Sequence, residues 1–167
     1  MSELSQSGLE KLQEQIGEYK GYDETDLREK SDKLIRLFLI NKIRQLLSQL
    51  SEQYQTARED DQDRLNLLLK STKRKLLTIN QSLKTPTYIQ EPFFKTMSIP
   101  SRRLSRIYDL EQNMLEEAES IKLELSDLLQ NGKERNAFEE HFLHIDAYVD
   151  NINQALFERE ALILGDE

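Results

Sequence analysis

Two histidines, His141 and His144, have the residue type and the spacing closest to those of a metal site. They are three positions apart, which places them on adjacent parts of one helix surface, with Glu140 and Asp146 nearby in the sequence. A di-iron bundle requires Glu-x-x-His motifs, whereas Phe138 stands three positions before His141 and the chain has no third histidine. We therefore expect no metal site and no cofactor, and we interpret His141 as a core-edge histidine that forms a hydrogen bond.

The side chains of nucleophilic catalysis are absent or isolated in this sequence. The chain has no cysteine and only five glycines, too few for a phosphate-binding loop, and it has no Gly-x-Ser-x-Gly motif. Glu111 is the acid that we place within the apolar stripe of its helix, and a buried carboxylate needs a partner. Arg159 is similarly placed on its own helix. We predict that these two residues form a structural ion pair and that the protein is not an enzyme.

Basic residues gather in one segment of the chain. Residues 70–106 hold nine lysines and arginines and a single acid, whereas residues 107–167 hold 16 acids and four bases. One interpretation is internal neutralisation, with a basic helix beside acidic ones. The other is that the segment meets phosphate or an acidic partner, because clustered cations raise the local concentration of anions. The candidate anion-binding residues are Lys70, Lys73, Arg74 and Lys84.

The connection at residues 85–100 combines all three prolines with several large apolar side chains. A loop of this length is uncommon in a compact domain unless it is functional or packed. The rings either plug the open end of a helical bundle or form a docking surface, because aromatic and arginine side chains are typical interface anchors. The candidate partner-binding residues are Tyr88, Phe93, Phe94, Met97, Arg102, Arg103 and Arg106.

The positions of glycine and proline predict long helices. Three stretches, 22–85, 101–131 and 133–164, contain no glycine and no proline, and these two residue types stop helices. Apolar residues recur within the stretches at intervals of three and four, as on one face of a helix, and strict alternation is absent. We expect a short helix at about 8–20, long helices at about 24–57, 62–84, 101–130 and 134–163, and a loop at 85–100.

These elements predict an all-α fold. A helix of about 30 residues is about 45 Å long, which suits an antiparallel up-down four-helix bundle or elongated, coiled-coil-like helical hairpins. The short N-terminal helix is an extra element, and residues 1–167 form one helical domain in this prediction. The expected core residues are Leu39, Ile43, Leu69, Leu76, Ile121, Leu125, Ile145 and Ile152.

The helix expected at 24–57 is apolar on two faces in its first half. Ile35 and Leu39 lie on the face that we assign to the core, and Leu34 and Phe38 lie on a second face. A helix that is apolar on two faces is covered on two sides. We expect the short N-terminal helix to cover the second face, with a partner protein as the alternative.

The overall composition is that of an acidic protein, with net charge −8 and 32% charged residues. The first residues lack the basic and apolar regions of a signal peptide. The longest uncharged apolar stretch, at residues 37–40, is much too short to span a membrane. We expect a soluble, cytoplasmic protein without a membrane span.

The function that the sequence favours is a non-enzymatic interaction, scaffold or adaptor protein. It would dock a protein partner, in particular an acidic one, through helix faces and residues 86–106. Two alternatives stay open: contact of residues 70–106 with an anion or nucleic acid, and, ranked last, a metal-binding or enzymatic bundle. The net charge of −8 disfavours nucleic acid without excluding it. A 3.5-residue apolar period also suits association of the chain with itself as a homo-oligomer.

Overall fold

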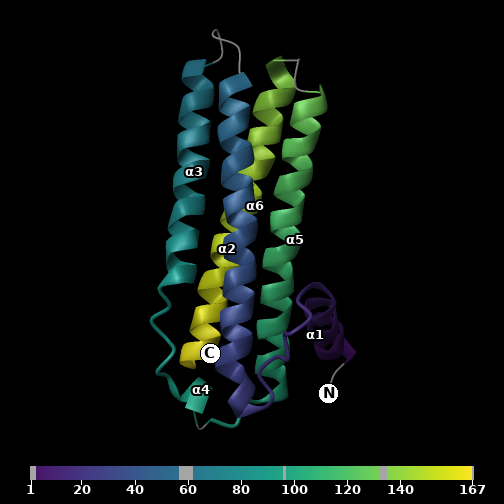
Figure 1. Ribbon diagram of the computed structural model, residues 1–167, viewed down its shortest axis with the longest axis vertical. Helices are drawn as coiled ribbons and strands as arrows, with labels where there is room; N and C mark the ends of the chain where they lie inside the picture. Colours follow the sequence, from purple (N-terminus) through teal and green to yellow (C-terminus); the bar gives the residue numbers. More distant parts are fainter. Residues whose placement is uncertain (1–2, 57–61, 96, 132–134, 167) are drawn as a thin grey trace.

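The computed structural model describes residues 3–56, 62–95, 97–131 and 135–166. These residues form helices and no strand, so the predicted all-α class is confirmed (Figure 1). The expected helix ends at 57 and 134 lie outside the described residues. The helices are α1 (Glu3–Gln15), α2 (Thr25–Thr56), α3 (Gln62–Lys84), α4 (Pro92–Lys95), α5 (Ser101–Asn131) and α6 (Arg135–Leu164).

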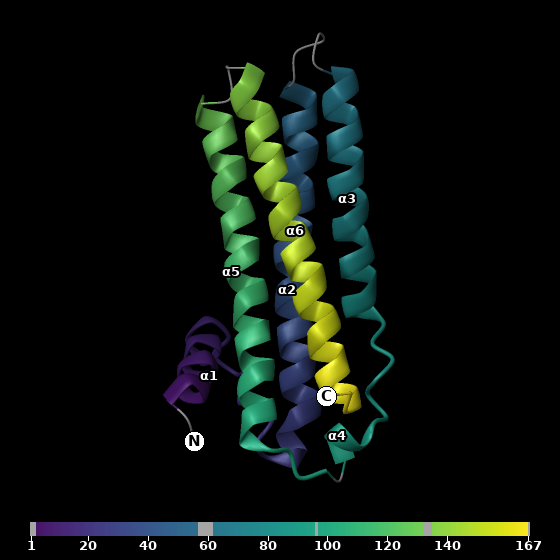
Figure 2. The ribbon, with the colours of Figure 1, turned by 180° about the vertical axis from the view of Figure 1, so that it is seen from behind.

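The four long helices form a bundle in which the chain runs alternately up and down (Figures 1 and 2). Helix α2 packs against α3 and α5, and α6 packs against the same two helices, so α2 and α6 face each other across a diagonal. As a result, the neighbours α3 and α6 run in the same direction, as do α2 and α5. The fold therefore consists of two antiparallel hairpins, α2–α3 and α5–α6, packed side by side.

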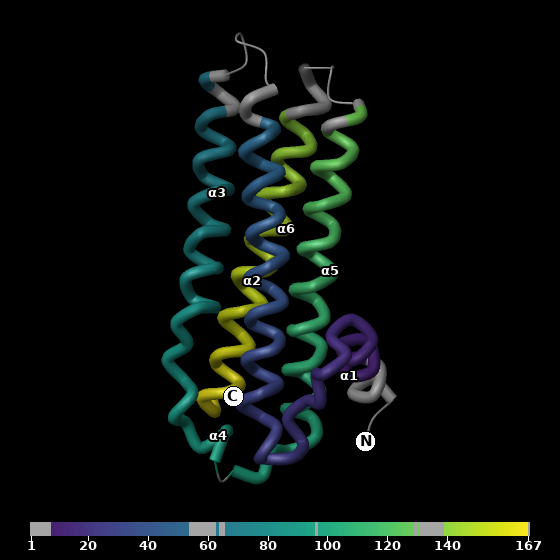
Figure 3. The backbone as a smooth tube through the Cα atoms, viewed as in Figure 1, coloured from purple at the N-terminus to yellow at the C-terminus, as the bar shows by residue number. Residues whose placement is uncertain are grey.

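The connection between α3 and α5 follows from this arrangement. These two helices are diagonal to each other, so residues 85–100 cross the lower end of the bundle, where the backbone trace shows them in teal (Figure 3). The crossing carries Phe93 and Phe94, in α4, and Tyr88 beneath the core, and all three rings are buried. The Phe93 and Phe94 rings meet edge to face with centroids 4.9 Å apart, and Phe94 stacks on Tyr88 at 5.8 Å. The aromatic residues of the connection thus plug this end of the bundle.

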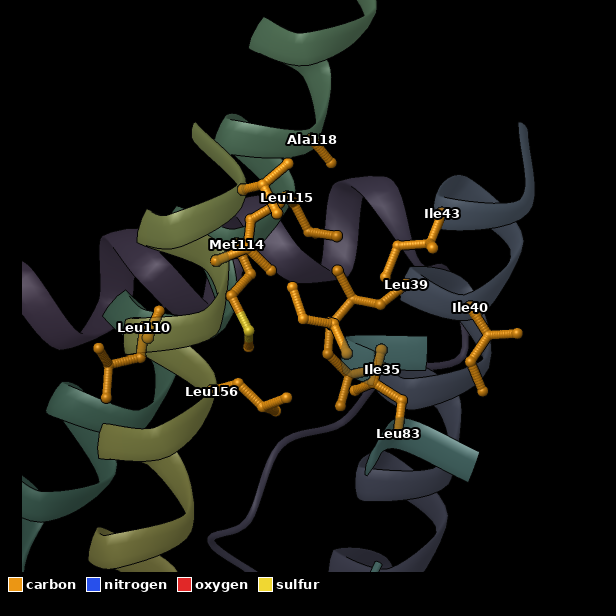
Figure 4. Packing of buried hydrophobic residues seen from close by; sticks show 14 of the residues in the cluster. Ile35, Leu39, Ile40, Ile43, Leu83, Leu110, Met114, Leu115, Ala118 and Leu156 are labelled. Atoms are coloured by element: carbon orange, nitrogen blue, oxygen red, sulfur yellow. The ribbon is translucent and has the colours of Figure 1, made fainter. Parts of the chain in front are cut away.

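The core lies along the axis of the bundle, between the apolar stripes of the four long helices. In Figure 4, Ile35 and Leu39 of α2 point toward Met114 and Leu115 of α5. All eight residues that the periodicity predicts as core are buried, so that prediction is confirmed. Within the described ranges, no helix combines the length and the apolar character needed to cross a bilayer.

Helix α1 packs on the outside of α5 (Figure 2). Gly8 permits this close approach, because a Cβ atom at this position would lie 3.1 Å from Asp109 Oδ1. The expected cover of the second apolar face of α2 is therefore wrong: Leu34 and Phe38 are only half-buried. The helix also ends at Gln15 rather than near residue 20, and an irregular linker, residues 16–24, leads to α2.

The linker is held against α5 by Tyr108. The backbone N–H of Tyr22 donates to the Tyr108 hydroxyl at 2.8 Å, and the two rings stack with centroids 5.8 Å apart. Gly21 has a φ of 80°, in the left-handed region that favours glycine, and a Cβ atom there would lie 2.5 Å from the same hydroxyl. This close packing brings Tyr19 and Tyr22 into the interior.

A pair of substitutions on α5 tests the position of the core. Ile121 is fully buried, whereas Leu123, two residues further along the same helix, is exposed. We expect Ile121→Ala to lower the free energy of unfolding by about 2–5 kcal/mol, because it leaves a cavity. Leu123→Ala should change it by less than about 0.5 kcal/mol. Chemical denaturation followed by circular dichroism measures both values, and equal losses would contradict the assigned core.

Candidate functional site

Arg159 of α6 lies at the centre of a buried polar network. Its side chain is only 1% exposed, and it pairs with two carboxylates that are fully buried. The Nε atom donates to Glu111 Oε1 at 2.8 Å, and Nη2 donates to Asp32 Oδ1 at 2.7 Å. The ion pair between Glu111 and Arg159 that the sequence predicts is therefore confirmed, and Asp32 of α2 is a second acid that the sequence analysis missed.

The Asp32 side of the network joins α2 to the connection after α3. Tyr88 donates its hydroxyl proton to Asp32 Oδ1 at 2.7 Å, and the same hydroxyl accepts from Arg159 Nη1 at 2.9 Å. The other carboxylate oxygen accepts from Arg36 Nε at 2.8 Å. Arg36 also donates to the carbonyl of Leu83, near the end of α3, at 3.1 Å. This half of the network therefore ties α2, α3 and the connection to α6.

The Glu111 side joins α5 to the linker before α2. The hydroxyl groups of Tyr19 and Tyr22 donate to separate oxygens of the Glu111 carboxylate. The Tyr22 hydroxyl also accepts from Arg159 Nη2 at 2.9 Å. Because a phenol can donate one hydrogen bond and accept another, each of these groups is satisfied without access to water. Unpaired, they would cost several kcal/mol in a buried site.

Burial and ion pairing act in opposite directions on the two carboxylates. Burial raises the pKa of Glu111, and the opposing effects of Arg159 and the tyrosine hydrogen bonds are smaller. Burial also disfavours the charge on Asp32, but there the ion pair with Arg159 and the hydrogen bonds outweigh it and lower the pKa. Burial, as the largest cause, raises the pKa of Tyr88 to about 12, so its hydroxyl stays protonated and donates to Asp32.

This network links helices and loops in the interior of the bundle. Arg159, Asp32, Glu111 and the tyrosines around them are buried. Two open surface grooves, about 560 and about 440 Å³ in volume, are lined by other residues. The chemistry of the site is therefore mutual neutralisation of fixed charges. It sets the positions of three long helices and two loops relative to one another.

The fold buries some of the residues that are predicted to bind a partner and leaves others at the surface. Tyr88, Phe93 and Phe94 are buried, so the plug interpretation describes them and they present no exposed rings. Arg102 and Met97 remain at the surface of the lower end. The docking region at 86–106 therefore keeps few of the anchors that the sequence suggested.

Two further arginines of this region act inside the fold. Arg103 is buried and donates through Nε to the carbonyl of Leu162 at 2.6 Å, where it satisfies the C-terminal end of α6. Arg106 is exposed but pairs with Glu158 of α6 at 2.6 Å. Internal neutralisation thus accounts for a part of the basic segment.

The candidate anion-binding residues lie on the surface of α3. All four are exposed, and in the part of the chain that the structure describes none of them forms an ion pair. Lys75 differs from them, because it pairs with Asp146 at 3.0 Å and with Asp150 at 2.9 Å on α6. Two exposed bases of α2, Lys33 and Arg44, also have no ion-pair partner among the described residues.

The two histidines lie near the upper end of the bundle, against α5. His141 is half-buried and contacts Glu124 through Nδ1, and its Nε2 lies 3.3 Å from Asp127 Oδ2. His144 is exposed, with Nδ1 3.3 Å from the other oxygen of Glu124. The core-edge interpretation of His141 therefore agrees with its position. No group of three or more potential ligands among the described residues is placed to hold a metal ion.

Comparison with known proteins adds no relative to this description. The chain matches no protein-family model, and no curated protein or solved structure is significantly similar to it. Its function must therefore be argued from the exposed surfaces and the buried groups alone.

Replacing the central arginine tests the role of the network. We expect Arg159→Leu to lower the free energy of unfolding by about 3–5 kcal/mol at pH 7, because two buried carboxylates lose their cation. Adding Asp32→Asn and Glu111→Gln to the same chain should restore part of that loss, since the unpaired charges are removed. Arg102→Leu, at an exposed position, serves as the control. A single variant as stable as the unaltered chain would show that the network does not support the fold.

The lowered pKa of Asp32 gives a separate prediction about pH. Ionised Asp32 stabilises the fold, and this contribution is complete above its ordinary pKa of 3.8 and is lost as the pH falls through the lowered value in the folded chain. Asp32→Asn should therefore cost more stability at pH 7 than at pH values below 3.8. Urea denaturation across this pH range measures the difference. The exposed control Glu14→Gln should show no such trend, and a loss independent of pH in Asp32→Asn would contradict the assigned shift.

Proposed function

We propose that the chain is a non-catalytic interaction module that docks an acidic partner protein on the outer side of the α2–α3 hairpin. This surface, the basic face, is built from bases that are exposed on the two helices and from one exposed leucine. Its members are Lys33, Leu37, Arg44, Lys70, Lys73 and Lys84. The proposal includes a cytoplasmic location, which the acidic, cysteine-free composition favours.

The observation that carries the proposal is the lack of neutralisation on this face. No acid occurs at residues 33–51 or at residues 64–90, so within these ranges neither helix offers a counter-ion. The exposed Glu29, four positions before Lys33, is the nearest exposed acid of α2 to this face. The acids of the chain are concentrated instead on α5 and α6, beyond the core. An uncompensated row of cations raises the local potential, steers an acidic partner toward the face and favours it over a basic one.

The apolar side chains of the basic face would slow the dissociation of the partner. Leu37 is 46% exposed near the lower end of the hairpin, next to Arg36, which contacts the carbonyl of Leu83 near the end of α3. The half-buried Leu34 and Phe38 are close to it in α2. Interfaces commonly place apolar anchors inside a charged rim, and the anchors determine dissociation whereas the rim affects association. A protein partner makes use of both parts, while a bare phosphate needs only the cations.

Charge reversal with a matched control tests this proposal. The test variant carries four substitutions on the basic face: Lys33→Glu, Arg44→Glu, Lys73→Glu and Lys84→Glu. The control carries four reversals at exposed bases elsewhere: Lys11→Glu, Lys20→Glu, Lys95→Glu and Arg102→Glu. Both variants change the net charge by the same amount. The control also removes bases from the lower end, which is the docking region that the sequence analysis favoured.

The measurement compares partners recovered from the native host by the tagged chain and its two variants. The most enriched acidic protein is then purified and titrated against all three by calorimetry, with a DNA duplex as a second probe. We expect the test variant to lose binding at least about tenfold, since several rim charges change sign, and the control to retain it. Loss in the control alone would place docking at the lower end. Binding of the duplex in preference to the acidic protein would replace the proposal with nucleic-acid contact.

A further inference from the structure

Helix α6 carries a second apolar stripe that faces away from the core. Leu143, Ala147, Phe157, Ala161 and Leu164 lie on one helix face by their spacing, and Asp150 and Gln154 interrupt the apolar residues in the middle of it. Leu143 is 58% exposed and Phe157 is 69% exposed, and Leu164 is also exposed. Helix α6 lies in front of α2 in the view of Figure 2. A stripe of this kind, opposite the core stripe of the same helix, indicates that α6 packs against something outside the bundle.

A groove lies beside this stripe, on the surface of α3. It has a volume of about 560 Å³, and its lining includes Glu160 of α6. The other lining residues that matter here are Arg74, Leu77, Thr78, Gln81 and Ser82 of α3. Leu77 is exposed within it. The groove thus offers apolar and hydroxyl-bearing surface at the same end of the bundle as Phe157.

The heights of the two features along the bundle can be compared directly. Helices α3 and α6 run in the same direction, and they are aligned by contacts of Thr72 with Asp146 at 3.4 Å and of Lys75 with Asp146 and Asp150. Because both helices rise about 1.5 Å per residue, a residue of α3 lies level with the residue of α6 about 74 positions later. Phe157 is therefore level with about residue 83 of α3, beside Gln81, Ser82 and Thr85 at the lower end of the groove.

We propose that two copies of the chain form a symmetric dimer through the α3–α6 side, in which Phe157 of each copy enters the α3 groove of the other. A two-fold axis parallel to the helices places α3 of one copy opposite α6 of the other and keeps every residue at its height. The contact then forms twice and the assembly closes, as in most homodimers.

The same two-fold rotation also brings two other exposed side chains of the α3–α6 side to the same height. Leu67 of α3, which is 72% exposed, is level with Leu143 of the second copy. The Phe157 contact with the groove and the pairing of Leu67 with Leu143 are therefore both satisfied by the same two-fold rotation. A second copy is the occupant that accounts for this match, because both halves of the surface belong to one chain.

This interface does not depend on the proposed function, although both surfaces use α3. Leu77 of the groove is seven positions from Lys70 and from Lys84, so it shares a helix face with these two members of the basic face. Its contacts are mainly apolar, so added salt should change the dimer dissociation constant little, whereas docking on the basic face should weaken steeply. The two surfaces can thus be tested one at a time.

Sedimentation equilibrium of the full chain tests the dimer. We expect the unaltered chain to dimerise, and Phe157→Asp to raise the dissociation constant about 30-fold or more, as for an interface anchor. Leu123→Asp on α5, exposed to a similar degree but off this side, should leave the constant unchanged. Ser82→Trp, which fills the groove from an exposed position, should also weaken the dimer. Circular dichroism shows whether each variant is folded.

Cross-linking tests the symmetry, because the chain contains no cysteine of its own. We expect a disulfide-linked dimer when a Leu67→Cys chain is mixed with a Leu143→Cys chain, and little from either chain alone. A monomeric unaltered chain at every concentration tested would overturn the proposal. So would a dimer that Phe157→Asp leaves intact, or cross-links that form equally well within each single-cysteine population.

Discussion

The buried charge of Arg159 is the constraint on which the remainder of the fold depends. A guanidinium removed from water requires carboxylates and further hydrogen bonds around it. Removing any one partner leaves a buried charge without its counter-ion, which lowers the free energy of unfolding. Asp32, Glu111 and the tyrosines meet that requirement only when α2, α5 and α6 lie at one relative height. The apolar stripes alone are compatible with several relative heights of the helices, and with the α5–α6 hairpin on either side of the α2–α3 hairpin. The buried network favours one of these arrangements.

The arrangement of the helices that the network favours requires the connection at residues 85–100 to cross the end of the bundle. Tyr88 reaches Asp32 and Arg159 only if the chain after α3 passes beneath α2. Arg28 holds the same crossing in place, since it donates to the carbonyls of Phe93 and Met97 at 2.8 Å. Arginines and aromatics that resemble interface anchors in the sequence therefore act inside the fold. Exposed bases without an ion pair among the described residues are left on the outer sides of α2 and α3.

The sequence predicts the local features well because helical periodicity is a short-range signal. The long helices, the core and the pairing of Glu111 with Arg159 all follow from which positions share a stripe. Asp32 lies in register with Ile35 and Leu39 of its own stripe and could have been found in the same way, but the apolar run after it dominates that helix. The burial of Phe93 and the packing of α1 on α5 depend on which helices are diagonal. That property arises from long-range contacts, which no local pattern records.

The proposed basic face would bind mainly through charge, whereas the proposed dimer interface on the α3–α6 side would bind mainly through apolar contacts. Together they would set the geometry of an assembly. A dimer closed through Phe157 would bury the α3–α6 side of each copy and leave the exposed bases of α2, Lys33 and Arg44, open to solvent. One assembly then presents two identical cationic rows, so a partner with two acidic segments gains the effective concentration of the second contact without any new interaction. A partner with a single segment gains nothing from the dimer. Loss of the Phe157 contact would therefore weaken the first kind of partner while leaving the second unaffected, even though no residue of the basic face has changed.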